Sequence, residues 1–227
     1  MDPTPHPRPQ IVFFDAGGVL VHFPPAEVRV AAALASLGLE RSPEVVTAAV
    51  ARARAARDAG GPGELLWPFT VEDARILAAA RILAEGLGLP ADAAGYLRDT
   101  CYHMRTLALY ADALPAMEGV ASRGIAVGLI SNAAGSLRGA LHHLGLATRL
   151  RPTIISAEVG SCKPDARIYA EALRSAGITD PARAVFVDDL PPNVAAAAGL
   201  GMRALHLCRD GSGGDLRTLA GLAERLG

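Results

Sequence analysis

The sequence predicts an α/β protein in which a parallel sheet carries helices on both faces, with an additional all-helical segment inserted early in the chain. Two observations lead to this fold class. Short apolar runs alternate with segments of helical spacing from about residue 115 onward, whereas residues 26–107 show helical spacing throughout. Strands that alternate with helices are typical of parallel sheets, because each crossover between parallel strands is usually a helix. We therefore expect a Rossmann-like core.

The first strand is predicted at residues 11–14, four consecutive apolar residues that follow Gln10. A short apolar run with such sharp limits is typical of a strand buried on both faces. Asp15 ends this run, and Gly17 and Gly18 follow closely, where they let the backbone approach a ligand. A carboxylate at the carboxyl end of a central parallel strand lies where open α/β sheets place their chemistry.

Residues 23–107 are predicted to be a helical insertion, so that residues 1–22 and 108–227 form one core. The insertion is rich in Ala, Leu, Arg and Glu, with apolar residues recurring at helical spacing. Glycine-containing breaks separate its helices, and Ser42 followed by Pro43 marks a plausible helix start. We expect four helices, at 26–37, 44–59, 71–87 and 91–106.

The remainder of the core alternates between the two kinds of element. Further strands are expected at 125–130, 153–156, 184–187 and 203–207. Helices are expected at 115–123, 137–144, 165–176, 193–198 and 215–226. With the strand at residues 11–14, this order predicts a mostly parallel sheet covered on both faces.

Several polar residues stand at the ends of these strands or in a nearby loop, namely Asp15, Ser131, Asn132, Lys163, Asp188 and Asp189. Because parallel strands end at one edge of a sheet, we expect these side chains to converge although they are distant in sequence. Clustered carboxylates suit Mg²⁺, which prefers oxygen ligands and often shares its shell with a phosphate. A serine and a lysine suit the other phosphoryl oxygens. The set predicts a phosphoryl-transfer centre with a carboxylate nucleophile.

Four segments together resemble a known family. They read FFDAGGVL at 13–20, LISN at 129–132, CKPDARIY at 162–169 and VFVDDLPPNV at 185–194. In this order at strand ends they resemble the haloacid dehalogenase (HAD) superfamily of aspartate-nucleophile hydrolases, in the branch (subfamily I) that has a helical cap after the first strand. The resemblance implies that residues 23–107 are this cap and that the protein is phosphatase-like.

The resemblance also implies a role for each matching residue. Asp15 would be the nucleophile that forms an aspartyl-phosphate, and it would also bind magnesium. Ser131 and the backbone amide of Asn132 would bind the substrate phosphate. Lys163 would neutralise charge on the phosphoryl oxygens and on Asp15.

The metal would complete this site. In the family that the sequence resembles, Asp189 corresponds to a direct metal ligand, and Asp188 to one that binds directly or through water. The backbone carbonyl of Gly17 would be a further ligand. The cofactor that this set implies is Mg²⁺.

Gly17 departs from the family pattern. Most phosphatases of this superfamily have a second aspartate at this position, where its side chain serves as general acid and base. A positioned acid or base is typically worth about 10²–10⁴ in rate, so we expect a slow or leaving-group-sensitive phosphatase, or one in which another group carries the proton. His22, where the chain enters the insertion, is a candidate for that group.

Three functions are therefore weighed. The first is a magnesium-dependent phosphatase of a small phosphorylated metabolite. The second is a metal-independent dehalogenase in which Asp15 attacks carbon; members with this activity generally lack the acidic pair, so Asp188 and Asp189 argue against it. The third is a non-catalytic protein that retains the fold, which Gly17 keeps open. The sequence does not identify the substrate, and it leaves the protein as either a monomer or a homodimer.

Composition limits the partners and the location. The net charge of −1 shows no basic excess, so neither nucleic acid nor an anionic membrane surface is expected as a partner. No apolar run approaches the ~18 residues of a membrane span, and the Pro-rich N-terminus does not resemble a signal peptide. The three cysteines lack a metal-type spacing, and we expect a reducing, cytoplasmic location.

Overall fold

The computed structural model describes residues 7–58, 69–102 and 106–226. At its centre lies a five-stranded sheet in the order β5-β4-β1-β6-β7, and every neighbouring pair of strands is parallel. The strands are β1 (Ile11–Phe14), β4 (Ala126–Ser131), β5 (Thr153–Ile155), β6 (Ala184–Asp188) and β7 (Arg203–His206). The predicted α/β fold is confirmed. Strand β1 occupies the middle of the sheet, and all four of its residues are buried.

The two faces of the sheet carry separate apolar clusters because the side chains of each strand alternate. On β1, Val12 and Phe14 pack in one cluster with buried residues of α5, α6 and α10. Ile11 and Phe13 pack in a second cluster with buried residues of α8 and α9. The core helices are α5 (Ala113–Ser122), α6 (Ser136–His143), α7 (Ser156–Val159), α8 (Ala166–Ser175), α9 (Pro191–Gly199) and α10 (Leu222–Arg225), with a short 3-10 helix, η4 (Pro181–Arg183).

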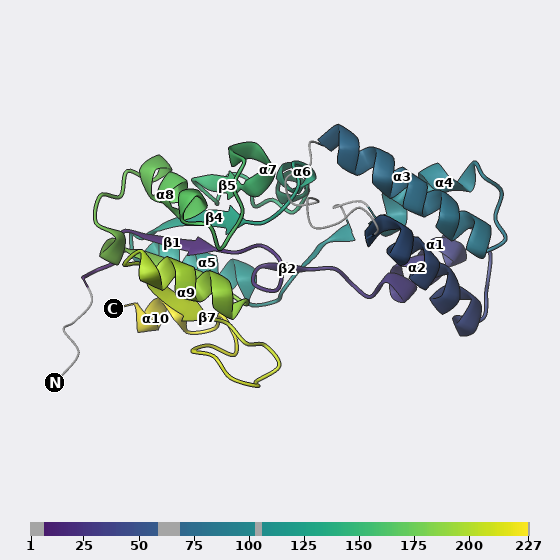
Figure 1. Cartoon of the computed structure of the whole chain (residues 1–227). Coiled ribbons are helices and arrows are strands. Elements are labelled where there is room, and N and C mark those ends of the chain that lie inside the picture. The colour runs from purple at the N-terminus through teal and green to yellow at the C-terminus, as the bar shows by residue number, and fades with distance from the viewer. Residues whose placement is uncertain (1–6, 59–68, 103–105, 227) are drawn as a thin grey trace.

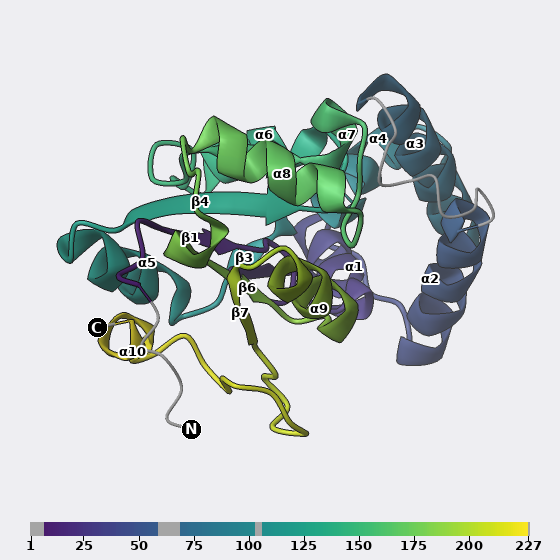
Figure 2. The same cartoon turned by 60° about the vertical axis from the view of Figure 1, so that its left-hand side comes forward.

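The first four helices form a separate group beyond the carboxyl ends of β1 and β4 (Figures 1 and 2). They are α1 (Ala26–Ser36), α2 (Pro43–Asp58), α3 (Phe69–Gly86) and α4 (Ala93–Leu97). Their apolar faces share one cluster of buried residues of their own. Within the described parts of the chain, no helix is both long and apolar enough to cross a membrane.

The fourth helix of this group differs from the prediction of one helix over 91–106, of which residues 103–105 lie outside the described residues. Helix α4 ends at Leu97 and continues as a π-helical turn, η2 (Arg98–Tyr102). The Thr100 hydroxyl donates to the Tyr96 carbonyl oxygen at 2.7 Å. This side-chain bond competes with the regular α-helical hydrogen bonding of the carbonyl.

A two-stranded link, which the sequence analysis did not predict, joins the two segments that lead into and out of this group. In it, β2 (Val21–His22) pairs antiparallel with β3 (Ala108–Leu109). The Tyr110 amide extends the pairing by donating to the Leu20 carbonyl oxygen at 3.0 Å. The link therefore places His22 beside Tyr110, with 4.7 Å between the ring centroids.

The predicted C-terminal helix over 215–226 is wrong for most of its length. Only α10 is helical, and Gly221 before it has a φ of 74°. The preceding residues are held by tertiary hydrogen bonds: the Asp215 carboxylate accepts from the His206 amide at 2.8 Å, and the Leu216 carbonyl accepts from the Cys208 amide at 2.8 Å. These bonds align residues 215–216 with the end of β7 and override the helical spacing.

Candidate active site

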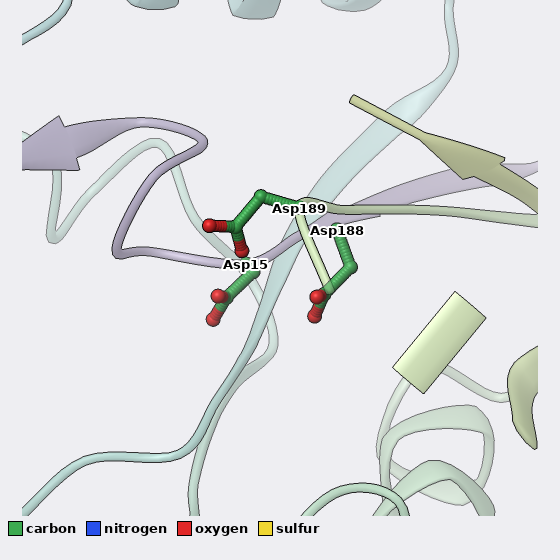
Figure 3. Close-up of side chains that lie close together, drawn as sticks. All are labelled: Asp15, Asp188 and Asp189. Atoms are coloured by element: carbon green, nitrogen blue, oxygen red, sulfur yellow. The ribbon is translucent and has the colours of Figure 1, made fainter. Parts of the chain in front are cut away.

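Three aspartates meet at the carboxyl edge of the sheet, each offering a carboxylate oxygen within 4.8 Å of the others (Figure 3). Strand β1 leads directly into Asp15, while Asp188 ends β6 and Asp189 follows it. The Asp15 amide donates to the Val187 carbonyl oxygen at 2.9 Å. This bond continues the parallel pairing of β1 with β6 and brings the ends of the two strands into register.

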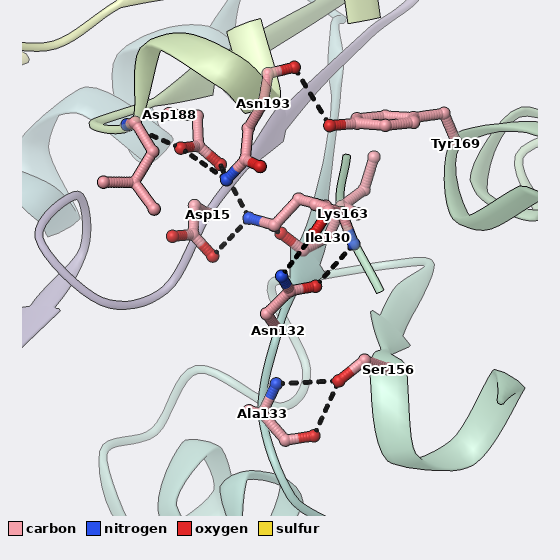
Figure 4. A network of polar contacts seen from close by, with 10 residues as sticks. Asp15, Ile130, Asn132, Ala133, Ser156, Lys163, Tyr169, Asp188 and Asn193 are labelled. Atoms are coloured by element: carbon pink, nitrogen blue, oxygen red, sulfur yellow. Dashed lines mark hydrogen bonds and ion pairs between the residues drawn. The ribbon is translucent and has the colours of Figure 1, made fainter. Parts of the chain in front are cut away.

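Lys163 lies between two of these carboxylates (Figure 4). Its Nζ is 2.8 Å from Asp15 Oδ1 and 2.6 Å from Asp188 Oδ2, and it donates to the Ile130 carbonyl oxygen at 2.9 Å. The side chain is only 1% exposed. An ammonium group with so little access to water is strongly coupled to its partners, so Lys163 holds the carboxylates in place as well as balancing their charge.

The side chain of Asn132 fixes the backbone of Lys163. Its Nδ2 donates to the Lys163 carbonyl oxygen at 2.8 Å, and its Oδ1 accepts from the Lys163 amide at 2.7 Å. The sequence analysis assigned a phosphate-binding role only to the backbone amide of Asn132, and it missed this clasp. Ser131, the last residue of β4, is buried at the same edge of the sheet.

Asp188 is held by several donors of the protein itself. Its Oδ1 accepts from the Leu190 amide at 2.8 Å, and Asn193 Nδ2 lies 3.0 Å and 3.1 Å from the two carboxylate oxygens. With Lys163 at Oδ2, both oxygens have protein donors, which suits a group that orients the lysine. Asn193 was not assigned a role from the sequence. Its position in the first turn of α9, four residues after Asp189, was the signal that was available.

Asp189 has the more open carboxylate of the acidic pair, and it lies against the loop that follows β1. Burial, with the negative charges of Asp15 and Asp188, raises the pKa of Asp189 to about 6. Burial also raises the pKa of Asp15, although Lys163 opposes this effect. A Cβ atom on Gly18, whose φ is 73°, would lie 2.1 Å from Asp189 Oδ2, so only glycine fits between loop and carboxylate.

These residues fit a divalent cation. Oxygen donors gathered at this spacing are the ligands that Mg²⁺ prefers. The pKa of Asp189 is raised first by burial and then by the negative charges of Asp15 and Asp188, and a cation would offset the charge of these carboxylates. Asp15 and Asp189 have carboxylate oxygens close to each other, as Figure 3 shows.

A cavity of about 270 Å³ opens beside the cluster. Gly17, His22, Ser131 and Asn132 are among the residues that line it, so the structure brings the candidate proton carrier and the candidate phosphate-binding residues to one cavity. Its other walls are largely apolar. Asp15 itself is buried with 8% of its surface exposed.

Arg209, which sequence reasoning missed, braces the loop between β1 and β2. Its guanidinium donates to the carbonyl oxygens of Gly18 (3.0 Å) and Val19 (2.7 Å), pairs with Asp112 and lies 3.7 Å from the centroid of the Tyr110 ring. Burial alone would raise the pKa of Asp112, but hydrogen bonds, chiefly from Arg209, lower it to about 2. The pair therefore stays ionised at neutral pH. No local spacing marks Arg209, because its partners lie 97 to 191 residues away.

Replacing Arg209 should misplace this loop and with it the Gly17 carbonyl. We expect Arg209→Met to lower kcat/KM for phosphate ester hydrolysis by roughly 10–10²-fold, since displacements of about 1 Å have effects of this size, and to raise the Mg²⁺ concentration needed for half-maximal activity. Steady-state kinetics under Mg²⁺ titration measure both. Arg203→Met, which removes a guanidinium bonded to the exposed Arg225 carbonyl, is the matched control. Equal kinetics for the two variants would refute the bracing role.

A parallel sheet that carries clustered carboxylates and a buried lysine at its carboxyl edge is an arrangement suited to a hydrolytic enzyme with a Rossmann-like fold. The chain belongs to the haloacid dehalogenase-like hydrolases: a family model of that description matches residues 9–201. The resemblance seen in the sequence is thereby confirmed, and the protein is a hydrolase.

Individual relatives include both phosphatases and dehalogenases. Phosphatase MT3486 of Mycobacterium tuberculosis (strain CDC 1551 / Oshkosh) is 31% identical over 125 residues, which cover 52% of this chain but only 57% of that protein. The crystal structure of a HAD phosphatase from Thermococcus onnurineus matches with a TM-score of 0.62 at 21% identity, covering 96% of this chain and 98% of that one. That of a 2-haloacid dehalogenase from Pseudomonas syringae pv. Tomato DC3000 matches with a TM-score of 0.64 at 24% identity and the same coverage. At these identities the two structures establish the fold alone.

Proposed function

We propose that this hydrolase is a magnesium-dependent phosphatase that releases phosphate from a small phosphorylated metabolite through an aspartyl-phosphate on Asp15. The observation that carries the proposal is the cluster of Asp15, Asp188 and Asp189 around a buried lysine. Attack of a carboxylate on carbon, as in a dehalogenase, requires no cation. A site with clustered carboxylates is poorly suited to a free anionic substrate unless a cation offsets their charge.

The residues divide the chemistry between them. A carboxylate oxygen of Asp15 forms a bond to phosphorus while the bond from phosphorus to the ester oxygen breaks, and water later cleaves the aspartyl-phosphate. Lys163 stabilises negative charge on the phosphoryl oxygens, and the Ser131 hydroxyl and the backbone amide of Asn132 bind them. Asp15, Asp189 and the Gly17 carbonyl would hold Mg²⁺, which would supply further neutralisation of phosphoryl charge when bound. Asp188 orients Lys163 through the contacts described above.

We further propose that α1–α4 act as a cap over this site. Phe23 and Leu107, which lie just before α1 and just before β3, both line the cavity beside Gly17. The two connections to the helical group therefore border the space in which the substrate would lie. Movement of this group would admit substrate and exclude water during transfer.

The direct test compares phosphate and halide release. The purified protein is incubated with an aryl phosphate and separately with 2-chloropropionate, each with Mg²⁺ or with a chelator. We expect phosphate release that requires Mg²⁺ and no halide release. Halide release in the presence of the chelator would instead establish the dehalogenase, and a lack of turnover across a broad panel of phosphorylated metabolites would favour a non-catalytic role.

Mg²⁺ binding should weaken in acid because it requires the ionised form of Asp189. The pKa of this group is about 6 without a cation, so protons compete with the cation below that pH and have little effect well above it. We expect the apparent Kd for Mg²⁺ to be about tenfold higher at pH 5 than on its plateau above pH 7. Calorimetric titration at pH 5, 6 and 7.5 measures it, and a Kd that does not change over this range would contradict the assignment.

A further inference from the structure

The walls of the cavity beside Gly17 indicate the chemical character of the leaving group, the part of the substrate attached to its phosphate. Among the described residues that line it are the apolar side chains of Val21, Phe23, Leu107, Ala133 and Leu137, and none of the described lining residues is an Asp, Glu, Lys or Arg. Val21 and Leu137 are each 1% exposed, so these walls belong to the packed core and do not give way easily.

The described polar side chains that line the cavity are few, namely His22, Ser131 and Asn132, and the His22 ring packs beside the Tyr110 ring with 4.7 Å between the centroids. The amide side chain of Asn132 is already engaged at both ends by the backbone of Lys163. Ser131 and the backbone around Gly17 lie at the sheet edge beside Asp15. A leaving group with several hydroxyls would lose its hydrogen bonds to water here and regain few of them, which is costly.

The volume and the mouth of the cavity indicate the size of the group. The volume of about 270 Å³ lies just below the range of ligand pockets, which typically begins at about 300 Å³. Phe23 is 46% exposed although it is large and apolar. A flat apolar group of about one ring would fit in such a space with room to spare, since a cavity of about 150 Å³ can hold benzene, and it would cover part of the Phe23 ring.

The chemistry at Gly17 independently favours the same kind of leaving group. Glycine supplies no proton to the departing oxygen, and a Cβ atom at this position would meet nothing within 4 Å. A phenol ionises with a pKa of about 10, as tyrosine does, whereas water and aliphatic alcohols are far weaker acids. A phenolate can therefore leave without a proton donor, but an alkoxide leaves slowly.

We propose that the substrate is a phosphate monoester of an aromatic alcohol, with its ring in the cavity lined by Val21, Phe23, Leu107 and Leu137. This inference rests on the proposed phosphatase function. In the reaction, Asp15 displaces the phenolate from phosphorus, and the phenolate takes up a proton from solvent after it departs. The product is a free phenol, and the reaction that supplies the substrate must be one that phosphorylates a phenolic hydroxyl.

The test compares esters that differ in one property at a time, in the presence of Mg²⁺. Phenyl phosphate and cyclohexyl phosphate are apolar and similar in size, but only the first has a good leaving group; glucose 6-phosphate is polar and has a poor one. We expect kcat/KM for phenyl phosphate to exceed that for cyclohexyl phosphate by roughly 10²–10⁴-fold, and cyclohexyl phosphate to inhibit at lower concentration than glucose 6-phosphate. Comparable kcat/KM values for all three would overturn the inference.

Variants at Gly17 isolate the missing proton. Gly17→Asp should lower the ratio of kcat/KM for phenyl phosphate to kcat/KM for cyclohexyl phosphate by at least about tenfold, because the new carboxyl group can protonate the alkoxide. Gly17→Asn, which has the same shape but no transferable proton, should leave the ratio near that of the unmodified protein. A ratio that responds equally to both substitutions would show that leaving-group protonation is not the weak step.

A variant at the cavity mouth tests where the ring binds. Phe23→Ala should raise KM for phenyl phosphate roughly threefold to tenfold. Val28→Ala removes an exposed apolar side chain from α1 and should leave KM unchanged. An unchanged KM in Phe23→Ala would remove Phe23 from the binding site.

Acetyl phosphate separates a failure of this inference from a failure of the proposed function. It is small and has a very good leaving group, so its hydrolysis needs Asp15 and Mg²⁺ but makes little use of the cavity. If acetyl phosphate is hydrolysed but phenyl phosphate is not preferred over cyclohexyl phosphate, the aromatic substrate is refuted and the proposed phosphatase function stands. If neither acetyl phosphate nor phenyl phosphate is hydrolysed, the proposed function itself fails.

Discussion

Asp15→Asn is expected to eliminate Mg²⁺-dependent phosphate release, with a loss in kcat on the order of 10⁶, the size seen when the covalent nucleophile of a hydrolase is removed. The amide nitrogen and oxygen are far weaker nucleophiles than a carboxylate, and no aspartyl-phosphate can form at residue 15. Stopped assays with an aryl phosphate measure the loss. Mass spectrometry of acid-quenched protein should find phosphate on the peptide containing residue 15 only in the unmodified protein.

The same substitution should leave the fold intact, which separates chemistry from stability. Burial raises the pKa of the Asp15 carboxyl group, so a neutral amide removes a charge that is costly to bury, while Lys163 keeps Asp188 and the Ile130 carbonyl as partners. We expect a melting temperature at least equal to that of the unmodified protein without metal. Asp180→Asn, at an exposed helix start, is the control with full activity. Undiminished turnover in Asp15→Asn would show that another group is the nucleophile.

The parts of the fold and site that follow from sequence are those that topology dictates. The run at residues 11–14 is apolar at every position because β1 lies in the middle of the sheet and is buried on both faces. Once the strands are parallel, their carboxyl ends must share an edge, and Asp15, Ser131 and Asp188 then meet without any signal from their spacing. Periodicity and chain order were sufficient for that step.

The contacts that hold the site together could not be predicted in this way. Asn132 clasps the backbone of Lys163, 31 residues away, and Arg209 reaches carbonyl oxygens in the loop after β1. Such bonds join a side chain to a backbone atom, and a backbone carbonyl has the same identity at every residue. The residue types in that loop therefore do not indicate which side chain will bind its carbonyl oxygens. The geometry appears only after the chain has folded.

The error at the C-terminus has a related cause. Residues 215–226 have the apolar spacing of a helix, and propensity is a weak prior that tertiary contacts override. The Thr218 hydroxyl donates to Asp112 at 2.5 Å and the Leu219 amide donates to the same carboxylate at 2.9 Å. A carboxylate that is held ionised by Arg209 accepts such bonds strongly. Residues 218–219 therefore bind Asp112 and do not form an additional helical turn.

Lys163→Met is expected to destabilise the metal-free protein by about 3–5 kcal/mol at pH 7.5, the cost of removing one partner from a buried ion pair. The methionine fills similar space but leaves Asp15 and Asp188 facing each other with no positive charge between them. Urea unfolding, followed by circular dichroism, measures the free energy of unfolding. Arg167→Met, which breaks the exposed pair with Asp165, is the matched control, and we expect no measurable loss from it.

The pH dependence of the loss of stability in Lys163→Met shows whether Lys163 stabilises the protein through its charge or through packing. Without Lys163, nothing opposes burial and the negative charge of Asp188, which raise the pKa of Asp15 in the folded state above its value of about 3.9 in the unfolded chain. The folded variant then retains protons that the unfolded chain releases, so its stability rises as the pH falls. The difference from the unmodified protein should therefore shrink between pH 7.5 and pH 5, and Mg²⁺ at pH 7.5 should restore part of it. A loss that is equal at both pH values and insensitive to Mg²⁺ would mean that Lys163 acts through packing, and the electrostatic account of the site would be wrong.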